Sequence, residues 1–465
     1  MRTHGDSRRQ DARRRRPWRR GAVLVLTALL LPVLLGITGL VIDAGLLMVS
    51  SRKAQNAADA AATAAAVDLL LGRSQTAART TAATYVQTHN RLARANVTTN
   101  IPPTSGPYQG NSKYIEVIVR IPVQTVLIQI LGVNSEQVVR RRAVAGIKGD
   151  STGVGVMMLD PTRRPGFSAS GNGSLNVNGT VVVNSDGGGM NERGQPINNG
   201  NSGSAIRLSG NARLTAVDIL SVGGITTSGN AGTHDYNNTR RNPLRTGMPI
   251  SPDPLSNLPV PTTANGAVAA FHPAVSLSGN QSVVLSPGVY PSIRLSGNAD
   301  AVFSPGIYII TGGGMSLSGN GNVFGTGVLI YNTGSDFNVY TGLPDAADAD
   351  NPPSAPSTTK FDDVSLSGNG EVRFTPIDDP SSPFDGLGFY QRRWNTQEVN
   401  ITGNGNIGAF RGTVYAKWAG MALSGNGRFA AQFIVRDVTL SGNGDITVDA
   451  TGQKLVQVNQ VQLVE

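Results

Sequence analysis

The sequence predicts a membrane-anchored α+β protein with a single N-terminal transmembrane helix, a small α+β module and a mainly-β domain. Three observations support this prediction: an apolar run after an arginine-rich tail, an alanine-rich segment after that run, and a Ser-Gly-Asn phrase that recurs in the rest of the chain. For the β domain we expect a right-handed parallel β-helix. An antiparallel β-sandwich is the alternative, because Asn-Gly is also a strong hairpin signal.

The N-terminus predicts a cytoplasmic arginine-rich tail at 1–20 and a transmembrane helix at 21–42. The uncharged run has 22 residues, and about 20 apolar residues suffice for a helix to cross a bilayer. The tail holds nine arginines against two aspartates, and positive residues stay on the cytoplasmic side. We therefore expect residues after the span to lie outside the cytoplasm, at a bacterial inner membrane. A cleaved signal peptide is the alternative, but the run is longer than a usual signal core.

Composition excludes several classes of function. The net charge of +9 falls to about +2 beyond the tail, so the chain lacks the basic, aromatic-rich surface that nucleic-acid binding needs. The absence of cysteine excludes disulfides, thiolate metal sites and cysteine nucleophiles. The 57 glycines and the low share of charged residues, 15%, are typical of a turn-rich β protein.

Residues 43–95 predict a helical stalk, because alanine is the best helix former and fills much of the segment from Ala54 to Ala66. Gly72 is expected to interrupt the helix, and Ser74 to cap a second stretch that runs to about Leu92. The alanine face has two interpretations. It belongs either to a stiff stalk that leaves the membrane or to a packing surface for a partner helix.

The ordered set Asp43, Gly45, Arg52, Gln55 and Asn56–Ala62, after a basic tail and one apolar span, resembles the N-terminal segment of bacterial TadE/TadG-like proteins. The resemblance covers roughly residues 18–70 and implies a part in Tad (tight adherence), or Flp pilus, assembly. Processed prepilins of these systems carry a glutamate five residues after the cleaved glycine. The corresponding residue here is Leu26, which favours a permanently anchored, TadG-like component.

Residues 96–150 are expected to form a small β-containing module of pilin-like size. Tyr114–Val119 and Val138–Ile147 have strand composition, and Pro122–Leu131 between them is expected to form one short helix.

Residues 151–465 are dominated by Ser-Gly-Asn, with an apolar residue at alternate positions on both sides of most copies. This pattern predicts strand, turn and strand. The copies begin at Ser170, Ser209, Ser228, Ser278, Ser296, Ser318, Ser367, Ser424 and Ser441, with a Thr402 variant. Where the spacing is regular it is near 20 residues, which is typical of solenoids, and we expect the asparagines to stack as a ladder. Polar, Gly- and Pro-rich segments at 184–204, 231–274 and 333–360 are expected to be surface loops.

No catalytic, cofactor or metal motif was found. The four histidines have no metal-ligand spacing. Polysaccharide hydrolysis uses paired carboxylates. The candidates for such a site are two pairs of aspartates, with a pair of arginines that could hold an acidic sugar: Asp362, Asp363, Asp378, Asp379, Arg392 and Arg393. We expect the aspartates to be solvated loop residues, and we predict no catalytic residue, cofactor or metal.

The sequence therefore predicts a non-enzymatic, single-pass envelope protein of the TadG-like type, acting in Tad/Flp pilus assembly or in surface adhesion. Its expected partners are the lipid bilayer, pilus-assembly or other envelope proteins, and surface glycans, but not nucleic acid. The alternative is a membrane-anchored β-helical polysaccharide lyase or hydrolase.

Overall fold

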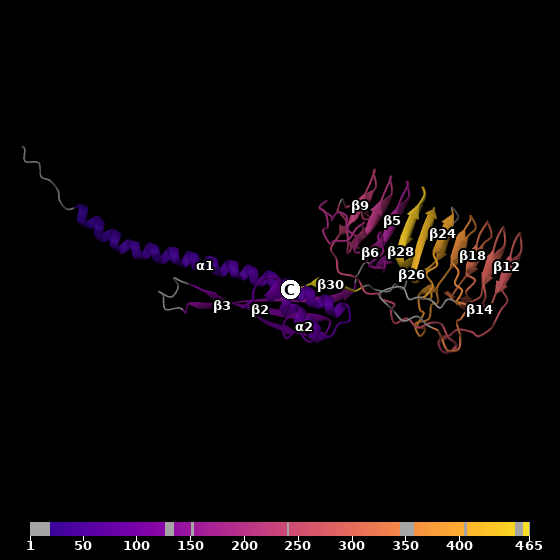
Figure 1. The fold of residues 1–465 in the computed structure, drawn as a ribbon, viewed down its shortest axis with the longest axis horizontal. Coiled ribbons are helices and arrows are strands. Elements are labelled where there is room, and N and C mark those ends of the chain that lie inside the picture. The colour runs from indigo at the N-terminus through magenta and orange to yellow at the C-terminus, as the bar shows by residue number, and fades with distance from the viewer. Residues whose placement is uncertain are drawn as a thin grey trace, which may run out of the picture. The chain divides into compact units, whose positions relative to one another are not determined.

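The computed structural model describes residues 19–125, 134–149, 153–239, 241–344, 358–403, 407–451 and 459–464. The chain forms two compact units (Figure 1). The first, called the N-terminal unit, contains residues 1–147 together with 461–465. The second, called the β unit, contains residues 148–460.

The N-terminal unit combines one long helix, a short helical pair and a four-stranded sheet of order β1-β2-β3-β30. Its elements are α1 (Arg19–Leu70), α2 (Gln75–Thr84), the π-helical turn η1 (Tyr85–His89), β1 (Asn96–Asn100), β2 (Tyr114–Gln124), β3 (Glu136–Gly149) and β30 (Asn459–Leu463). The apolar run and the alanine-rich segment thus share one continuous helix of 52 residues, about 78 Å long at 1.5 Å per residue.

The predicted end of this helix is confirmed. Gly72 has a φ of +72°, a conformation that glycine adopts without steric cost. The Ser74 hydroxyl then accepts a hydrogen bond of 3.2 Å from the Ala77 amide and caps α2.

The alanine face of α1 is covered from within the chain. Seven of its alanines have no exposed surface and form one core with side chains of β2, β3 and α2. These alanines are Ala54, Ala57, Ala58, Ala61, Ala62, Ala65 and Ala66. Small side chains allow the sheet to approach the helix closely. Because the sheet and α2 cover this face, it is neither a bare stalk nor a surface open to a partner helix.

The sheet differs from the sequence-based expectation at two places. Pro122, expected to begin a short helix, lies inside β2 and pairs with Val138 of β3 in an antiparallel register. The helix prediction fails because the alternating pattern of β2 continues through Gln124 and pairs with β3 along its whole length. The remainder of the expected helix, 126–131, lies outside the described residues.

Strand β30 comes from the end of the chain, which the sequence pattern assigned to the β-rich part at 151–465. It lies next to β3 in the sheet, and the Val464 amide donates a 2.8 Å hydrogen bond to the Val144 carbonyl. The β unit is therefore inserted between two strands of the N-terminal unit, β3 and β30.

We expect Val461→Asp to destabilise the N-terminal unit by about 1–3 kcal/mol, because a carboxylate would replace an apolar side chain packed on its core. Hydrogen exchange of β3 amides in the full chain would measure this. Gln462→Asp, at an exposed position of the same strand, is the control. Equal exchange in the two variants would contradict a stabilising role for β30.

The β unit consists almost entirely of short strands. Its first part contains β4 (Val154–Met158), β5 (Phe167–Ala169), β6 (Ser174–Val183), β7 (Ile206–Leu208), β8 (Arg213–Ser221), β9 (Ile225–Thr227), β10 (Gly232–Asp235) and β11 (Leu244–Arg245). Its middle part contains the 3-10 turn η3 (Thr263–Asn265), β12 (Val275–Leu277), β13 (Ser282–Leu285), β14 (Gly288–Tyr290), β15 (Ile293–Leu295), β16 (Asp300–Phe303), β17 (Gly306–Thr311), β18 (Met315–Leu317), β19 (Val323–Gly325) and β20 (Val328–Thr333). Its last part contains β21 (Val364–Ser367), β22 (Val372–Phe374), β23 (Leu387–Gln391), β24 (Val399–Gly403), β25 (Ile407–Phe410), β26 (Gly412–Gly425), β27 (Gly427–Phe429), β28 (Ala431–Ser441) and β29 (Asp445–Asp449). Two strands and a turn thus lie inside the segment 231–274, which was expected to be a loop.

The pairings between these strands are parallel. Parallel pairing is what the β-helix expected for this domain requires, whereas the alternative sandwich requires antiparallel pairing. The strands that precede the Ser-Gly-Asn turns pair in the order β12-β15-β18-β21-β24-β26-β28-β5-β7-β9. Figure 1 shows the labelled members of this series side by side. The order is not that of the chain, because the last strands of the unit, β28 and β29, pair with its first, β5 and β6.

The turns stack as the sequence predicts. Asparagine side chains of adjacent copies are hydrogen-bonded, for example Asn211 to Asn172 at 2.7 Å and Asn298 to Asn280 at 3.0 Å. The bond from Asn172 to Asn443, 3.1 Å long, joins copies 271 residues apart in the chain. The turn glycines have positive φ in the nine Ser-Gly-Asn copies, which explains why glycine recurs there.

Residues 246–274 connect the two ends of the stack, from β11 to β12. Their contacts run along it in order: Ser251 bonds with Asn184 beyond β6, Asp253 with Tyr415 of β26, and Thr263 with Val339 beyond β20. Partly buried Leu255 and Leu258 pack on a hydrophobic cluster formed by β-unit residues. This segment, called the crossing segment, lets the chain return to the opposite end of the stack.

Candidate functional site

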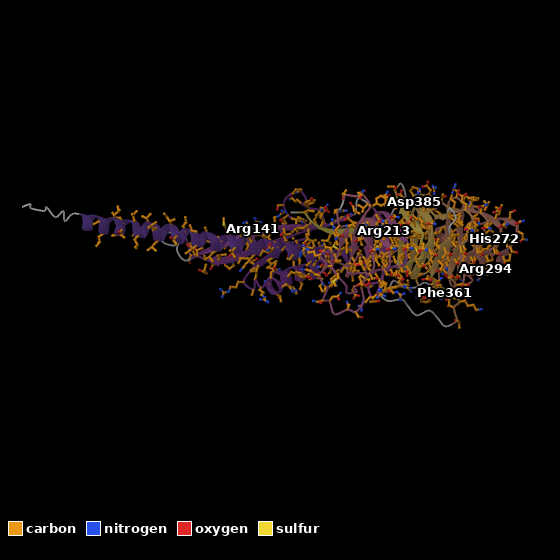
Figure 2. The ribbon with its side chains drawn as sticks, turned by 90° about the horizontal axis from the view of Figure 1, so that it is seen from above. Arg141, Arg213, His272, Arg294, Phe361 and Asp385 are labelled. Atoms are coloured by element: carbon orange, nitrogen blue, oxygen red, sulfur yellow. The ribbon has the colours of Figure 1, made fainter. Side chains whose placement is uncertain are left out.

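The first half of α1 presents apolar side chains to its surroundings. The large hydrophobic residues between Leu24 and Val49, apart from Leu47, are 43–72% exposed, and Figure 2 shows carbon side chains projecting from this helix. By length and composition, α1 from Leu24 onward is suited to cross a membrane.

Polar residues of the second half of α1 form hydrogen bonds with the sheet. Gln55 donates hydrogen bonds to Asp59 at 2.7 Å and to the Arg142 carbonyl of β3 at 3.3 Å. The Arg141 guanidinium donates to the Ser51 hydroxyl at 2.8 Å. Asp43 is 1% exposed and lies within α1, far from either end of this helix.

A buried carboxylate lies at the centre of the sheet. Glu116 of β2 has no exposed surface and accepts hydrogen bonds from Arg142, Asn100, Thr104 and Ser105. Burial by itself would raise the pKa of Glu116. The hydrogen bonds, led by that from Arg142, outweigh it and lower the pKa from 4.5 to about 2.

Helix α1 has an exposed apolar half and a hydrogen-bonded polar half. This helix is also the part of the chain that is similar to a known family. Residues 21–68 match the Tad family model. That model is described as "Putative Flp pilus-assembly TadE/G-like", in agreement with the resemblance seen in the sequence. No curated protein and no solved structure matches the chain.

Beyond the Tad segment, the six charged residues considered for catalysis do not form one site. Arg392 has a fully buried side chain and pairs with Asp336 at 2.8 Å. Asp362 instead pairs with Arg294 at 2.9 Å, and Asp378 and Asp379 lie exposed in a loop before β23.

Arg393 has a structural role that the sequence did not reveal. Its buried guanidinium donates to the carbonyls of Leu255, Ser256 and Leu258 in the crossing segment. Tyr415 donates a 2.7 Å hydrogen bond to Asp253 of the same segment. Desolvation and the nearby carboxylate of Asp253 raise the pKa of Tyr415, so the tyrosine stays a neutral donor. These contacts fix the crossing segment to the stack.

The histidines and tryptophans are dispersed. His89 packs against Tyr85 with ring centroids 4.7 Å apart, and His272 stacks on Tyr290 at 4.5 Å. His234 lies on β10, Trp418 is buried, and His4 lies outside the described residues. Among the described residues, no cluster of three or more His, Asp or Glu side chains could hold a metal ion.

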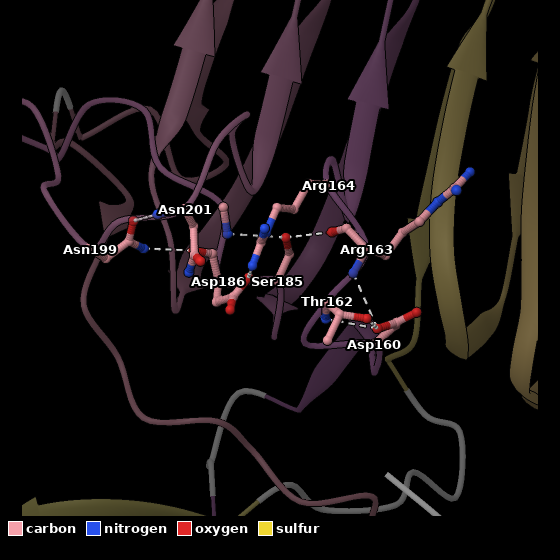
Figure 3. A network of polar contacts seen from close by, with 9 residues as sticks. Asp160, Thr162, Arg163, Arg164, Ser185, Asp186, Asn199 and Asn201 are labelled. Atoms are coloured by element: carbon pink, nitrogen blue, oxygen red, sulfur yellow. Dashed lines mark hydrogen bonds and ion pairs between the residues drawn. The ribbon is translucent and has the colours of Figure 1, made fainter. Parts of the chain in front are cut away.

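A polar network orders the segment 184–204, which the sequence predicted as a loop (Figure 3). Asp186 pairs with Arg164 at 2.7 Å, and its carbonyl accepts from the side-chain amides of Asn199 and Asn201. The Asp160 carboxylate accepts from the backbone amide and hydroxyl of Thr162. The Asp160 bonds close a local turn, whereas the Asp186 contacts join separate segments of the β unit. The network therefore supports structure.

A groove follows the strands after the Ser-Gly-Asn turns. One part of it, about 780 Å³, is lined by Arg373, Arg411 and Arg428 among others. A second part, about 600 Å³, is lined by residues that include Arg213 and His234. Asn176 and Asp445 line both parts. This surface was not predicted from the sequence. Its signal was the alternation of polar residues with apolar ones after each turn.

Proposed function

We propose that this protein is a non-enzymatic, single-pass envelope protein of the TadG-like type that supports Tad/Flp pilus assembly or surface adhesion. The observation that supports this most is the Tad match on a helix whose first half is apolar and exposed. In this proposal α1 crosses the bacterial inner membrane with the arginine-rich tail in the cytoplasm. The β unit lies outside, where it meets other envelope proteins.

We further propose that the β unit is a parallel β-helix, right-handed like other crossovers between parallel strands. Its support is the repeated parallel pairing of three kinds of strand. One kind precedes each Ser-Gly-Asn turn, one follows it, and one closes the circuit, as β12, β13 and β14 pair with β15, β16 and β17. Such a scaffold presents long rows of side chains to a partner at its surface.

The alternative of a polysaccharide lyase or hydrolase lacks support. Paired carboxylates must face one cleft to act as acid and base. Here Arg392 and Arg393 are buried and engaged with Asp336 and with the crossing segment, so they cannot bind an acidic sugar beside Asp362.

The orientation of α1 tests the proposal. We expect replacement of Arg13–Arg16, Arg19 and Arg20 by neutral residues to weaken or invert membrane insertion, because the charge difference across the span sets the orientation. Protease accessibility of the β unit in spheroplasts would measure it. Replacement of the exposed arginines Arg193 and Arg207, far from the span in sequence, is the control. An unchanged orientation of the tail variant would contradict the proposed topology.

A further inference from the structure

The groove on the β unit is built as a continuous row of side chains from two separate parts of the chain. In the parallel registers, Arg428 of β27 lies beside Thr447, Thr447 beside Asn176, Asn176 beside Thr215, and Thr215 beside His234. Adjacent strands are about 4.8 Å apart, so this row extends over about 19 Å. A row of this kind matches an extended polymer better than a compact small molecule.

The acidic groups of the groove are engaged within the protein. Asp445 accepts a 2.5 Å hydrogen bond from the Ser174 hydroxyl. Asp449 accepts from Thr451 and from Asn178, and these bonds lower its pKa. Glu371 forms an ion pair with Arg373. The carboxylates therefore have few free acceptor positions for a ligand.

Three arginines of the groove differ from its carboxylates in their contacts with the rest of the protein. Arg213, Arg411 and Arg428 are exposed, and in the described part of the chain none of them forms an ion pair. Their guanidinium groups present N–H donors in the planar geometry that binds a carboxylate through two hydrogen bonds. The carboxylates keep their negative charge, but the four arginines that line the groove outnumber its three carboxylates. This balance, together with three open guanidinium groups, favours an anionic ligand.

The other side chains of the row narrow the class of polymer. Thr215, Thr447 and Asn176 are hydroxyl and amide groups, which suit sugar hydroxyls. Single-stranded nucleic acid binds through aromatic side chains that stack on bases, and the row from Arg428 to His234 has only the histidine ring at one end. We propose that this groove binds a linear polysaccharide that carries carboxylate groups. The proposal goes beyond membrane anchoring and pilus assembly, because it assigns a ligand to the β unit.

Binding of polygalacturonate oligosaccharides to the full chain in detergent, followed by titration calorimetry, tests the proposal. We expect saturable binding, little binding of neutral dextran, and weakening by salt. The double variant Arg411→Ala/Arg428→Ala should bind at least about tenfold more weakly, which is the effect of losing one charged hydrogen bond. Both side chains are exposed, so the fold should persist, and circular dichroism would verify this.

The control is the double variant Arg193→Ala/Arg207→Ala, which removes two exposed arginines outside the groove. We expect it to bind like the unmodified protein. Equal binding by the groove variant, equal affinity for dextran, or tighter binding of oligodeoxythymidylate through the same arginines would each overturn the proposal. None of these outcomes bears on the orientation of α1, so the proposed function is tested separately.

Discussion

Gly368→Ala should destabilise the β unit by at least about 3 kcal/mol. Gly368, the turn glycine of one Ser-Gly-Asn copy, has a φ of +119°, which is strained for any residue with a Cβ. An added methyl group would also overlap the carbonyl oxygen and backbone of Gly319 in the adjacent copy. Backbone cannot move aside as a flexible side chain can, so strain and overlap add.

Gly279→Ala provides a matched control for this prediction. Gly279 occupies the same position of another copy, with a φ of +67°, but a Cβ there has no heavy atom within 4 Å. We expect a loss of about 1 kcal/mol from backbone strain alone. Chemical denaturation followed by the fluorescence of Trp394 and Trp418 would compare the variants. Similar losses for both would contradict close stacking of the turns.

Glu116→Ala should destabilise the N-terminal unit by about 3 kcal/mol, because it removes the ion pair with Arg142 and the hydrogen bonds from Asn100 and Thr104 that the carboxylate accepts. The same group makes stability depend on pH. Its pKa is lowered from 4.5 to about 2 on folding, so its contribution is complete above about pH 4.5. It is lost as the pH falls towards 2, and the loss amounts to about 3 kcal/mol.

Hydrogen exchange of β2 amides between pH 2 and pH 5, corrected for the intrinsic exchange rate, would measure both effects. We expect the variant to lose the part of the pH dependence that Glu116 causes. Glu136→Ala, at an exposed residue of the same hairpin that bonds only with Gln124 in the described residues, should change neither stability nor its pH dependence. A variant with unaltered pH dependence would show that Glu116 titrates normally in the folded state.

Local features were predictable where their cause is local. The end of α1 at Gly72, the Ser74 cap and the positive φ of the turn glycines depend on the conformational preferences of single residues. The asparagine ladder was predictable because an asparagine occupies the same position in every copy of the turn. Pro122 was misassigned because the pairing of β2 with β3, a contact between distant residues, overrides the local signal.

The groove could not be derived from the sequence because its parts come together only in the fold. Arg428 and Thr215 lie in the same row although more than two hundred residues separate them, and the strands between them come from both ends of the β unit. The pairs of aspartates and arginines are adjacent in sequence, but the fold gives their members separate partners. Arg392 pairs with Asp336, whereas Arg393 bonds with the crossing segment.

Consecutive residues encode the apolar helix with its arginine-rich tail, the likeness to TadE/G-like segments and the recurring turns, so these features could be predicted before the fold was known. Three others depend on contacts between distant residues: the cover of the alanine face by the chain's own sheet, the completion of this sheet by β30, and the stacking of β28 and β29 on β5 and β6. They could not be predicted, because the edge of a parallel sheet accepts any strand with the right alternation of side chains. The choice among them depends on the crossing segment, held by Arg393 and Tyr415, and not on order along the chain.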